Sequence, residues 1–516
     1  MRSRLSGRFK QALKRRSMGF DMSRGLALLF NVKEARVSRI ISALRKYKFT
    51  LAAFLLPFTV RAIPEVIAGP YPIGWDIIAF YVPNTLDMAA GRMSIWGILG
   101  SGPLMYSFIV PIYVLTRINP ILLFKVAGPV LFGVLCWSVF RLCEKKLGLS
   151  VRNAFLSVLF LALYFVSLRV AWDAYQAELG LTFFVLGLTV LGESGSVARS
   201  TAARSAFFLF AILANQLVAG LVVGTVILEM LRAKGWGSFG LALSRLAPVA
   251  LFGLVVYATL QPSIGPGVSI LGGSFAPLNV AYNTVFLVYA FGPLVPLAVI
   301  GLSLMTRSLF SSWIAVSAAG IVISTLPGQV FQDIGYRWVL LLSIPVLIAA
   351  AQGYQKLSAR SGSLDGRRWL KAVRLGVPLV LLISAGMYST IQAASVPYFS
   401  LFLGYVPSSL LQNSVPLSDS ADVVQAMHWL EASMPSNSAV IMHEAFYGWA
   451  RAYLSPDSKI INSLLRSPSS ELNLVTSYGH VFTVWWVPGS GWFSPTFPTG
   501  ASVSATFGDI AVYEYR

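Results

Sequence analysis

The sequence predicts an all-α polytopic membrane protein with about eleven transmembrane helices and a small C-terminal α/β domain on the extracytoplasmic side. Hydrophobic residues make up 56% of the 516 residues, and charged residues make up only 12%. Apolar runs near the length of a bilayer-spanning helix recur along the chain, and the pattern changes to that of a soluble domain after residue 393. A soluble protein of this size could not bury so much apolar surface, so we expect membrane lipids around most of the chain.

The formal net charge of +20 raises the question of nucleic-acid binding. Basic residues, however, occur in short clusters between the apolar runs rather than on one folded face. This distribution is typical of the loops of a membrane protein, so we expect no nucleic-acid partner.

Residues 1–48 form a basic segment that we expect to be cytoplasmic. It holds 14 Lys or Arg residues against only Asp21 and Glu34. Apolar residues at roughly helical spacing favour an amphipathic helix on anionic lipid, and a solvated basic tail that fixes topology fits equally well. No short apolar region with a cleavage site follows, so we expect the first helix to be retained as an anchor.

Residues 49–393 form the predicted transmembrane domain. With the N-terminus inside, 30 of the 40 Lys and Arg residues fall in cytoplasmic segments, which predicts an odd number of spans and a C-terminus outside. We expect the membrane to be the plasma membrane of a prokaryote. The two spans that meet at Asn215 and Gln216 would also fit one bent helix. The predicted spans are 50–69, 120–142, 152–169, 177–192, 203–215, 216–232, 246–260, 284–305, 311–326, 336–353 and 375–393.

The first outer loop, 70–119, is the longest in this arrangement. Its segment 103–118 is apolar enough to cross the membrane, but a crossing there would reverse every later loop. We therefore expect a juxtamembrane helix on the outer surface.

Residues 394–516 show the pattern of a small α/β domain. The expected elements are a helix over 421–433 and strands over 439–442, 459–461, 480–487 and 509–515.

Asp76 is the acidic residue of greatest interest in the first outer loop. It follows a turn in the stretch "GPYPIGWDIIAFY", and it could take a proton from a hydroxyl or hold Mg²⁺ or Mn²⁺. A helix cap, or an ion pair with Arg92 or Arg61, would explain an Asp after Gly as well. Asp87 lies eleven residues on, about three helical turns, so it could share a face with Asp76.

Two later outer segments carry further charges. The stretch "SLRVAWDAYQAELG" places Arg169, Asp173 and Glu178 close together between two spans, where charges are expensive and their default interpretation is functional. Asp333 and Arg337 stand four residues apart where another span begins. A guanidinium there suits bidentate contact with a lipid phosphate, and an intrahelical pair between the two residues is the alternative.

The order of these features resembles the GT-C superfamily of membrane glycosyltransferases that use polyprenyl-linked sugars. The resemblance covers about 50–350 and rests on the single first span, the long outer loop with its Asp, the helix "PLMYSFIVPIYVL", the span ending in "RLCEKKLG" and the late "YRWVLLLSIP". Members include protein O-mannosyltransferases, the aminoarabinose transferases of lipid A and the catalytic subunit of oligosaccharyltransferase. The resemblance implies that Asp76 matches the first-loop acid, Asp173 the second-loop acid and Arg337 the arginine that meets lipid phosphate.

The C-terminal domain also resembles the start of an oligosaccharyltransferase outer domain. The stretch "HWLEASMPSNSAVIMHEAFYGW" keeps the frame, but the acceptor-binding WWDYG motif is replaced by His443, Glu444, Phe446, Tyr447 and Gly448. Recognition of a peptide sequon is therefore not expected.

These observations lead to the hypothesis of a glycosyltransferase that moves a sugar from a polyprenyl-phosphate-linked donor to an acceptor at the outer face. Asp76 would act as base or metal-associated carboxylate, and Asp173 as a second carboxylate that could share the metal. The substrate would be bound by Arg337, Asp87, Glu178, Arg169 and Asp333. A flippase or transporter for lipid-linked sugar, which would favour broken helices in two related halves, and a non-catalytic membrane subunit are the alternatives.

Overall fold

A computed structural model describes residues 47–190, 197–232, 239–260, 277–302, 307–325, 335–360, 368–393, 409–464 and 466–515. The chain divides into two units, Met1–Ala52 and Ala53–Arg516. In the first unit only 47–52 are described, and they are helical. The predicted amphipathic helix within 1–48 therefore lies almost wholly outside the described residues, and so does Asp333.

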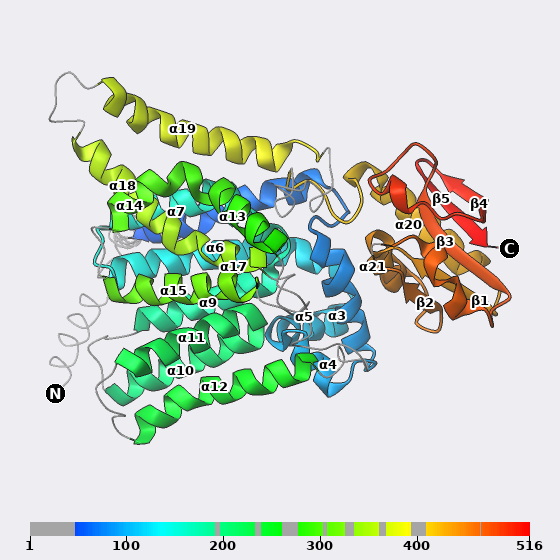
Figure 1. Cartoon of the computed structure of the whole chain (residues 1–516), viewed down its shortest axis with the longest axis horizontal. Helices are drawn as coiled ribbons and strands as arrows, with labels where there is room; N and C mark the ends of the chain where they lie inside the picture. Colours follow the sequence, from blue (N-terminus) through cyan, green and yellow to red (C-terminus); the bar gives the residue numbers. More distant parts are fainter. Residues whose placement is uncertain are drawn as a thin grey trace, which may run out of the picture. The chain divides into compact units, whose positions relative to one another are not determined.

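The described chain is helical almost throughout as far as Thr390 (Figure 1). Every span expected from the sequence overlaps a helix, and the doubtful pair at Asn215 is two helices. The first helix runs over Tyr47–Ile67. The others are η1 (Ile77–Tyr81), α3 (Val82–Ala89), α4 (Ile95–Gly100), α5 (Pro103–Thr116), α6 (Pro120–Lys145), α7 (Val151–Leu163), α8 (Phe165–Asp173), α9 (Tyr175–Val190), α10 (Val197–Ala214), α11 (Gln216–Arg232), α12 (Phe239–Leu260), α13 (Pro277–Phe291), η2 (Gly292–Leu294), α14 (Val295–Leu302), α15 (Arg307–Ile323), α17 (Gly335–Leu341), α18 (Ser343–Arg360) and α19 (Arg368–Thr390).

Five helices in the described ranges are long and apolar enough to cross a bilayer, and α7 with α8 makes a sixth if this pair, bent by 65°, counts as one span. The protein is thus a multi-pass membrane protein. The count of eleven spans and the orientation of the termini stay predictions.

The segment that contains α17 and α18 lies deep in the helical assembly. In the apolar window of Gly335–Ala359, 83% is buried, against 17% for Ala372–Thr390, which contains most of α19. Close packing with α14 explains part of this difference, because a Cβ on Gly301 or Gly353 would meet the backbone of the other helix. Arg337 is therefore held by a central, tightly packed element.

The C-terminal part carries a five-stranded sheet, drawn in orange and red in Figure 1. The strand order is β2-β1-β3-β5-β4, with β1 parallel to its two neighbours and β5 antiparallel to its own. The expected helix and four strands are confirmed within one or two residues, whereas α21 and β4 were not foreseen. The elements are α20 (Ser420–Ser433), β1 (Ser438–Met442), α21 (Glu444–Tyr453), β2 (Lys459–Asn462), β3 (His480–Trp486), β4 (Ala501–Phe507) and β5 (Ile510–Tyr515).

This domain contacts the first loop through α21, which packs on η1 and α3. Gly448 makes the close approach feasible, since a Cβ there would overlap the backbone of Ile78 and Ala79. Arg451 extends the contact with an ion pair to Asp87, 2.5 Å from Nη2 to Oδ2. The domain thereby holds the short helix that follows Asp76.

A strap over 409–416 forms the second contact. The carbonyl of Gln412 accepts hydrogen bonds from the backbone N–H of Gly74, at 2.9 Å, and from Nε1 of Trp172, at 3.1 Å. The amide of Asn413 donates to the carbonyl of Pro72 at 3.1 Å. The strap thus ties the start of the first loop to the end of α8.

Candidate functional site

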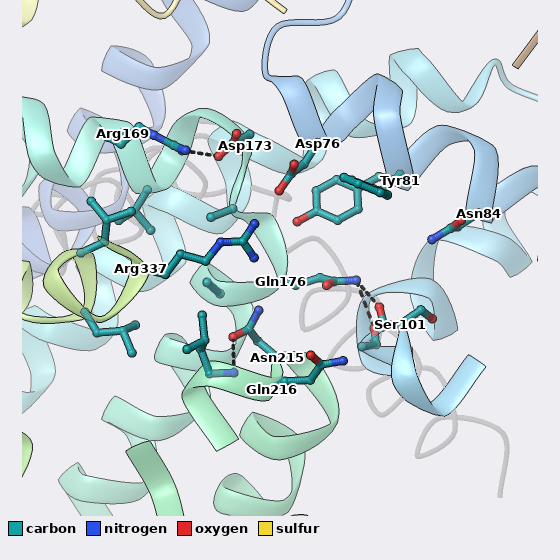
Figure 2. A pocket seen from close by; sticks show the side chains of 18 of the residues that line it. Asp76, Tyr81, Asn84, Ser101, Arg169, Asp173, Gln176, Asn215, Gln216 and Arg337 are labelled. Carbon is teal, nitrogen blue, oxygen red and sulfur yellow. Dashed lines mark hydrogen bonds and ion pairs between the residues drawn. The ribbon is translucent and has the colours of Figure 1, made fainter. Parts of the chain in front are cut away.

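A cavity of about 380 Å³ lies between the first loop, α8, α9, α11 and α17. Its charged lining residues in the described part of the chain are Asp76, Arg169, Asp173 and Arg337. These come from three segments that are far apart in the sequence. Figure 2 shows the side chains of Asp76, Asp173 and Arg337 directed toward the same space.

Asp76 stands immediately before η1, a one-turn π-helix, which is a form often found at functional sites. Its side chain makes no capping hydrogen bond. The alternatives considered for it, a helix cap or an ion pair with Arg92 or Arg61, are not realised, because Arg92 pairs with Asp87 and Arg61 with Glu65. The carboxylate instead faces the cavity (Figure 2).

Gly74 brings the first loop against the end of α8. Its φ of +96° is unfavourable for other residues, and a Cβ would stand 2.5 Å from the carbonyl oxygen of Trp172 and 3.1 Å from Cβ of Asp173. Only glycine therefore allows Asp76 to follow so close to Asp173.

Asp173 ends α8 and is 1% exposed. Its Oδ1 accepts a charge-assisted hydrogen bond from Arg169, one helical turn earlier, whose guanidinium also lies over the ring of Trp172. Its Oδ2 is buried and has no hydrogen-bond partner among the described residues. One acceptor oxygen of Asp173 is thus left for a ligand.

Arg61, fully buried on the first helix, holds the end of α8 in place. Its Nε donates to the carbonyl of Ala171 at 2.7 Å, and its Nη2 donates to the hydroxyl of Tyr175 at 2.7 Å. Glu65 neutralises it at 2.8 Å and also pairs with Lys125 at 2.8 Å. This network satisfies carbonyls that the end of a helix leaves open.

Arg337 lies on α17 and is exposed to the cavity. Its Nε donates to the hydroxyl of Tyr336 at 3.0 Å, and its guanidinium lies 5.6 Å from the centre of that ring. Figure 2 shows the guanidinium between the carboxylates and the opposite wall. A planar donor group held in this way is suited to binding phosphate.

Electrostatics distinguish Asp76 from an ordinary surface carboxylate. Burial, and next the negative charge of Asp173, raise the pKa of Asp76 to about 7, although Arg337 and Arg169 oppose the shift. Burial also raises the pKa of Tyr81 well above its usual value, so this hydroxyl stays protonated beside Asp76. Asp76 can therefore exchange a proton near neutral pH.

The acidic pair also bears on metal binding. Within the described ranges, no group of three or more His, Cys, Asp or Glu side chains could hold a metal ion. Asp76 and the free Oδ2 of Asp173 offer two carboxylates, and Mg²⁺ or Mn²⁺ is commonly held by one or two carboxylates together with water and substrate phosphate. The number and type of these groups match what such an ion commonly takes from a protein.

Two of the expected site residues, Asp87 and Glu178, are described by the structure but are not part of the lining. Asp87 does not share a face with Asp76 toward the cavity: its two oxygens hold Arg92 and Arg451. Glu178 is fully buried outside the lining, and its oxygens have no hydrogen-bond partner among the described residues. Asp333 lies outside the described residues, so its proposed pairing with Arg337 stays a prediction.

The cavity also contains polar residues that the sequence alone did not single out. Among them are Tyr81, Asn84, Gln176, Asn215 and Gln216. Asn215 and Gln216 were noticed only as a break between two spans. An amide pair at such a break is a signal for a polar site, because unpaired polar groups are costly in a membrane.

Comparison of the sequence with protein-family models and with curated proteins finds no match. The structure, however, resembles the arabinofuranosyltransferase AftD from mycobacteria with a TM-score of 0.51 at 12% identity. The match covers 90% of this chain but only 40% of AftD.

Two further solved structures match with lower scores. ArnT from Cupriavidus metallidurans, solved with undecaprenyl phosphate bound, has a TM-score of 0.44 at 14% identity, over 90% of this chain and 97% of ArnT. The oligosaccharyltransferase of Archaeoglobus fulgidus in its apo form has a TM-score of 0.46 at 10% identity, over 86% of this chain and 70% of that one. Together with the element order described above, the likeness to AftD establishes that this chain has a GT-C-like fold.

Proposed function

We propose that this protein is a membrane glycosyltransferase that transfers a sugar from a polyprenyl-phosphate-linked donor to an acceptor hydroxyl at the outer membrane face. The observation that carries the proposal is the convergence of Asp76, Asp173, Arg169 and Arg337 on one cavity. The fold, which is shared with an arabinofuranosyltransferase, supports it.

In the proposed reaction Asp76 accepts the proton of the acceptor hydroxyl while that oxygen attacks the anomeric carbon of the donor sugar. The bond between this carbon and the phosphate oxygen breaks, and its electron pair stays on the phosphate. The products are the glycosylated acceptor and polyprenyl phosphate. A base with a pKa of about 7 is well matched to this role near neutral pH.

Arg337 would bind the phosphate and stabilise the charge that it gains as the bond breaks. A guanidinium can bind phosphate through two parallel N–H donors, and α17 places that of Arg337 at the start of an apolar segment. A donor bound there can keep its polyprenyl tail in the bilayer while the head group reacts in the cavity.

Asp173 would act as a second carboxylate, oriented by Arg169. As the alternative to Asp76 as base, Asp76 and Oδ2 of Asp173 would hold a Mg²⁺ or Mn²⁺ ion, which would add positive charge beside the phosphate. The metal and its two ligands are part of the proposal.

The test uses purified full-length protein in proteoliposomes with labelled polyprenyl-phosphate sugars and a cell-envelope fraction as acceptor. We expect labelled product together with release of polyprenyl phosphate, and a roughly 10²- to 10⁴-fold lower rate for Asp76→Asn. The matched control is Glu144→Gln, which removes a carboxylate paired with Arg141 away from the cavity. Movement of intact donor across the vesicle membrane without release of polyprenyl phosphate would refute the enzyme and favour a flippase.

A further inference from the structure

The wall of the cavity opposite the acidic pair carries three amide side chains whose orientation is fixed. Gln176 lies on α9, Gln216 begins α11, and Asn215 occupies the break between α10 and α11. We call these three residues the amide triad. Each has one end of its amide held by backbone, which leaves the other end for a ligand.

The two glutamines are held by the end of α4. Nε2 of Gln176 donates to the carbonyl of Ser101 at 2.5 Å, and Nε2 of Gln216 donates to the carbonyl of Gly100. Gly100 is the last residue of α4 and Ser101 is its C-cap, so both carbonyls need donors from outside the helix. This requirement fixes the nitrogen and oxygen positions of both amides. Both Oε1 atoms are therefore acceptors without a hydrogen-bond partner among the described residues.

The amide of Asn215 is held by its oxygen, whereas the amides of the two glutamines are held by their nitrogens. Its Oδ1 accepts hydrogen bonds from the backbone N–H groups of Leu217, at 3.0 Å, and Val218, at 3.1 Å, and so caps the N-terminus of α11. The Nδ2 group is left as a donor, and Figure 2 shows it directed toward the side of Arg337. The triad thus presents two acceptors and one donor group.

A hydroxyl both donates and accepts a hydrogen bond, so neighbouring hydroxyls of a sugar ring match this pattern. All charged side chains of the described lining belong to Asp76, Arg169, Asp173 and Arg337, so the triad carries no charge of its own. The three amides are half-buried and neutral, so they offer an ammonium or a carboxylate no counter-charge in exchange for the water that such a group would lose there. The cavity volume of about 380 Å³ lies at the low end for ligand sites, which suits one sugar unit.

We propose that the amide triad binds the hydroxyls of an uncharged sugar unit and thereby selects a neutral donor sugar against amino sugars and uronates. The inference rests on the proposed function in one respect: it assumes that the sugar arrives on polyprenyl phosphate bound at Arg337. The triad acts in recognition and takes no part in bond making.

The test measures binding and transfer separately, with purified full-length protein in nanodiscs. The probes are polyprenyl phosphate alone and polyprenyl phosphate linked to mannose, to an amino sugar or to glucuronate. The variants are Asn215→Ser and Asn215→Asp, because both new side chains can still cap α11 but neither has the amide donor. Ser150→Asp, a change of one capping residue for another on α7 away from the cavity, is the matched control.

We expect mannose to increase the affinity over that of polyprenyl phosphate alone, and the charged sugars not to do so. Asn215→Ser should reduce this gain roughly 3- to 10-fold, the usual effect of one hydrogen bond, without changing the Kd of polyprenyl phosphate itself. Asn215→Asp should shift the preference toward the amino sugar, because it places a carboxylate where the amide donor was.

Equal gains in the wild type and the variants, or a wild-type preference for a charged sugar, would overturn the inference. If sugar-dependent binding follows the prediction but no sugar is transferred, the proposed reaction is wrong and the subsite stands. If transfer occurs and the Asn215 variants bind and use all donors like the wild type, the reaction stands and the subsite is wrong.

Discussion

Replacement of Asp76 by Asn gives the sharpest test of the site, because it keeps the shape of the side chain and removes its ability to accept a proton. The structure indicates that little else should change. The side chain of Asp76 makes no capping hydrogen bond to η1, and the first loop is held by other groups, notably Gly74 and Asn413. Loss of activity should therefore come without loss of fold.

The expected magnitude follows from the pKa of about 7. Roughly a tenth of the Asp76 carboxyls would be deprotonated at pH 6 and roughly nine-tenths at pH 8. The wild-type transfer rate should thus rise about tenfold over this range, since the base must be deprotonated to act. The Asp76→Asn rate should be roughly 10²- to 10⁴-fold lower at pH 8 and should lack this rise.

Whereas the transfer rate should rise with pH, the free energy of unfolding should fall with pH because of the same carboxyl group. The pKa of Asp76 is raised from 3.8 to about 7 by folding, so the folded state binds its proton more tightly than the unfolded state. The stability that comes from this proton is fully present below pH 3.8 and is lost as the pH rises through about 7. Asp76→Asn removes this loss, so the variant should gain stability relative to the wild type as the pH rises.

The assay combines initial transfer rates at pH 6, 7 and 8 with thermal unfolding of both proteins in the same detergent. Wild-type rates in purified Asp76→Asn, with a donor that the wild type uses, would end the assignment of Asp76 as base. A pH profile that the variant shares with the wild type would assign the titration to another group.

Three further predictions concern donor binding, domain packing and topology. Arg337→Lys keeps the charge but cannot bind phosphate in a bidentate manner, so it should raise the KM for donor more than that for acceptor in steady-state kinetics. Gly448→Ala places a Cβ against the backbone of η1 and should lower the free energy of unfolding by about 1–3 kcal/mol in denaturant titrations, whereas Gly386→Ala, with open space around it, should not. Single cysteines at Ser3 and Ser436 should be labelled by a membrane-impermeant reagent from opposite sides, and labelling of both from one side would refute the predicted topology.

In the C-terminal domain, the sequence predicted one helix and four strands from the spacing of their apolar residues. The helix that became α20 and the four apolar strands are confirmed, because buried faces impose a clear pattern. Two elements, β4 and α21, were not predicted from the sequence. β4 consists largely of small residues and is mostly exposed, and α21 spans only ten residues.

The sequence by itself determined the membrane class, the succession of helices and the acids and bases worth considering. These follow from composition and local spacing, since a bilayer demands long apolar helices and makes each charge near them conspicuous. Spacing along the chain could not decide which charges meet. Asp87 was grouped with Asp76 by helical turns, yet it pairs with Arg92 and Arg451.

Only the tertiary structure decided the composition of the cavity. Asp76 and Asp173 line the same cavity because Gly74 permits contact between two backbones that are about a hundred residues apart in sequence, and no local pattern encodes such a contact. The amides of Gln176 and Gln216 became directed acceptors only when the carbonyls of 100–101 came within reach. Local sequence limits which groups are present, whereas long-range packing sets which of their atoms remain open to a ligand.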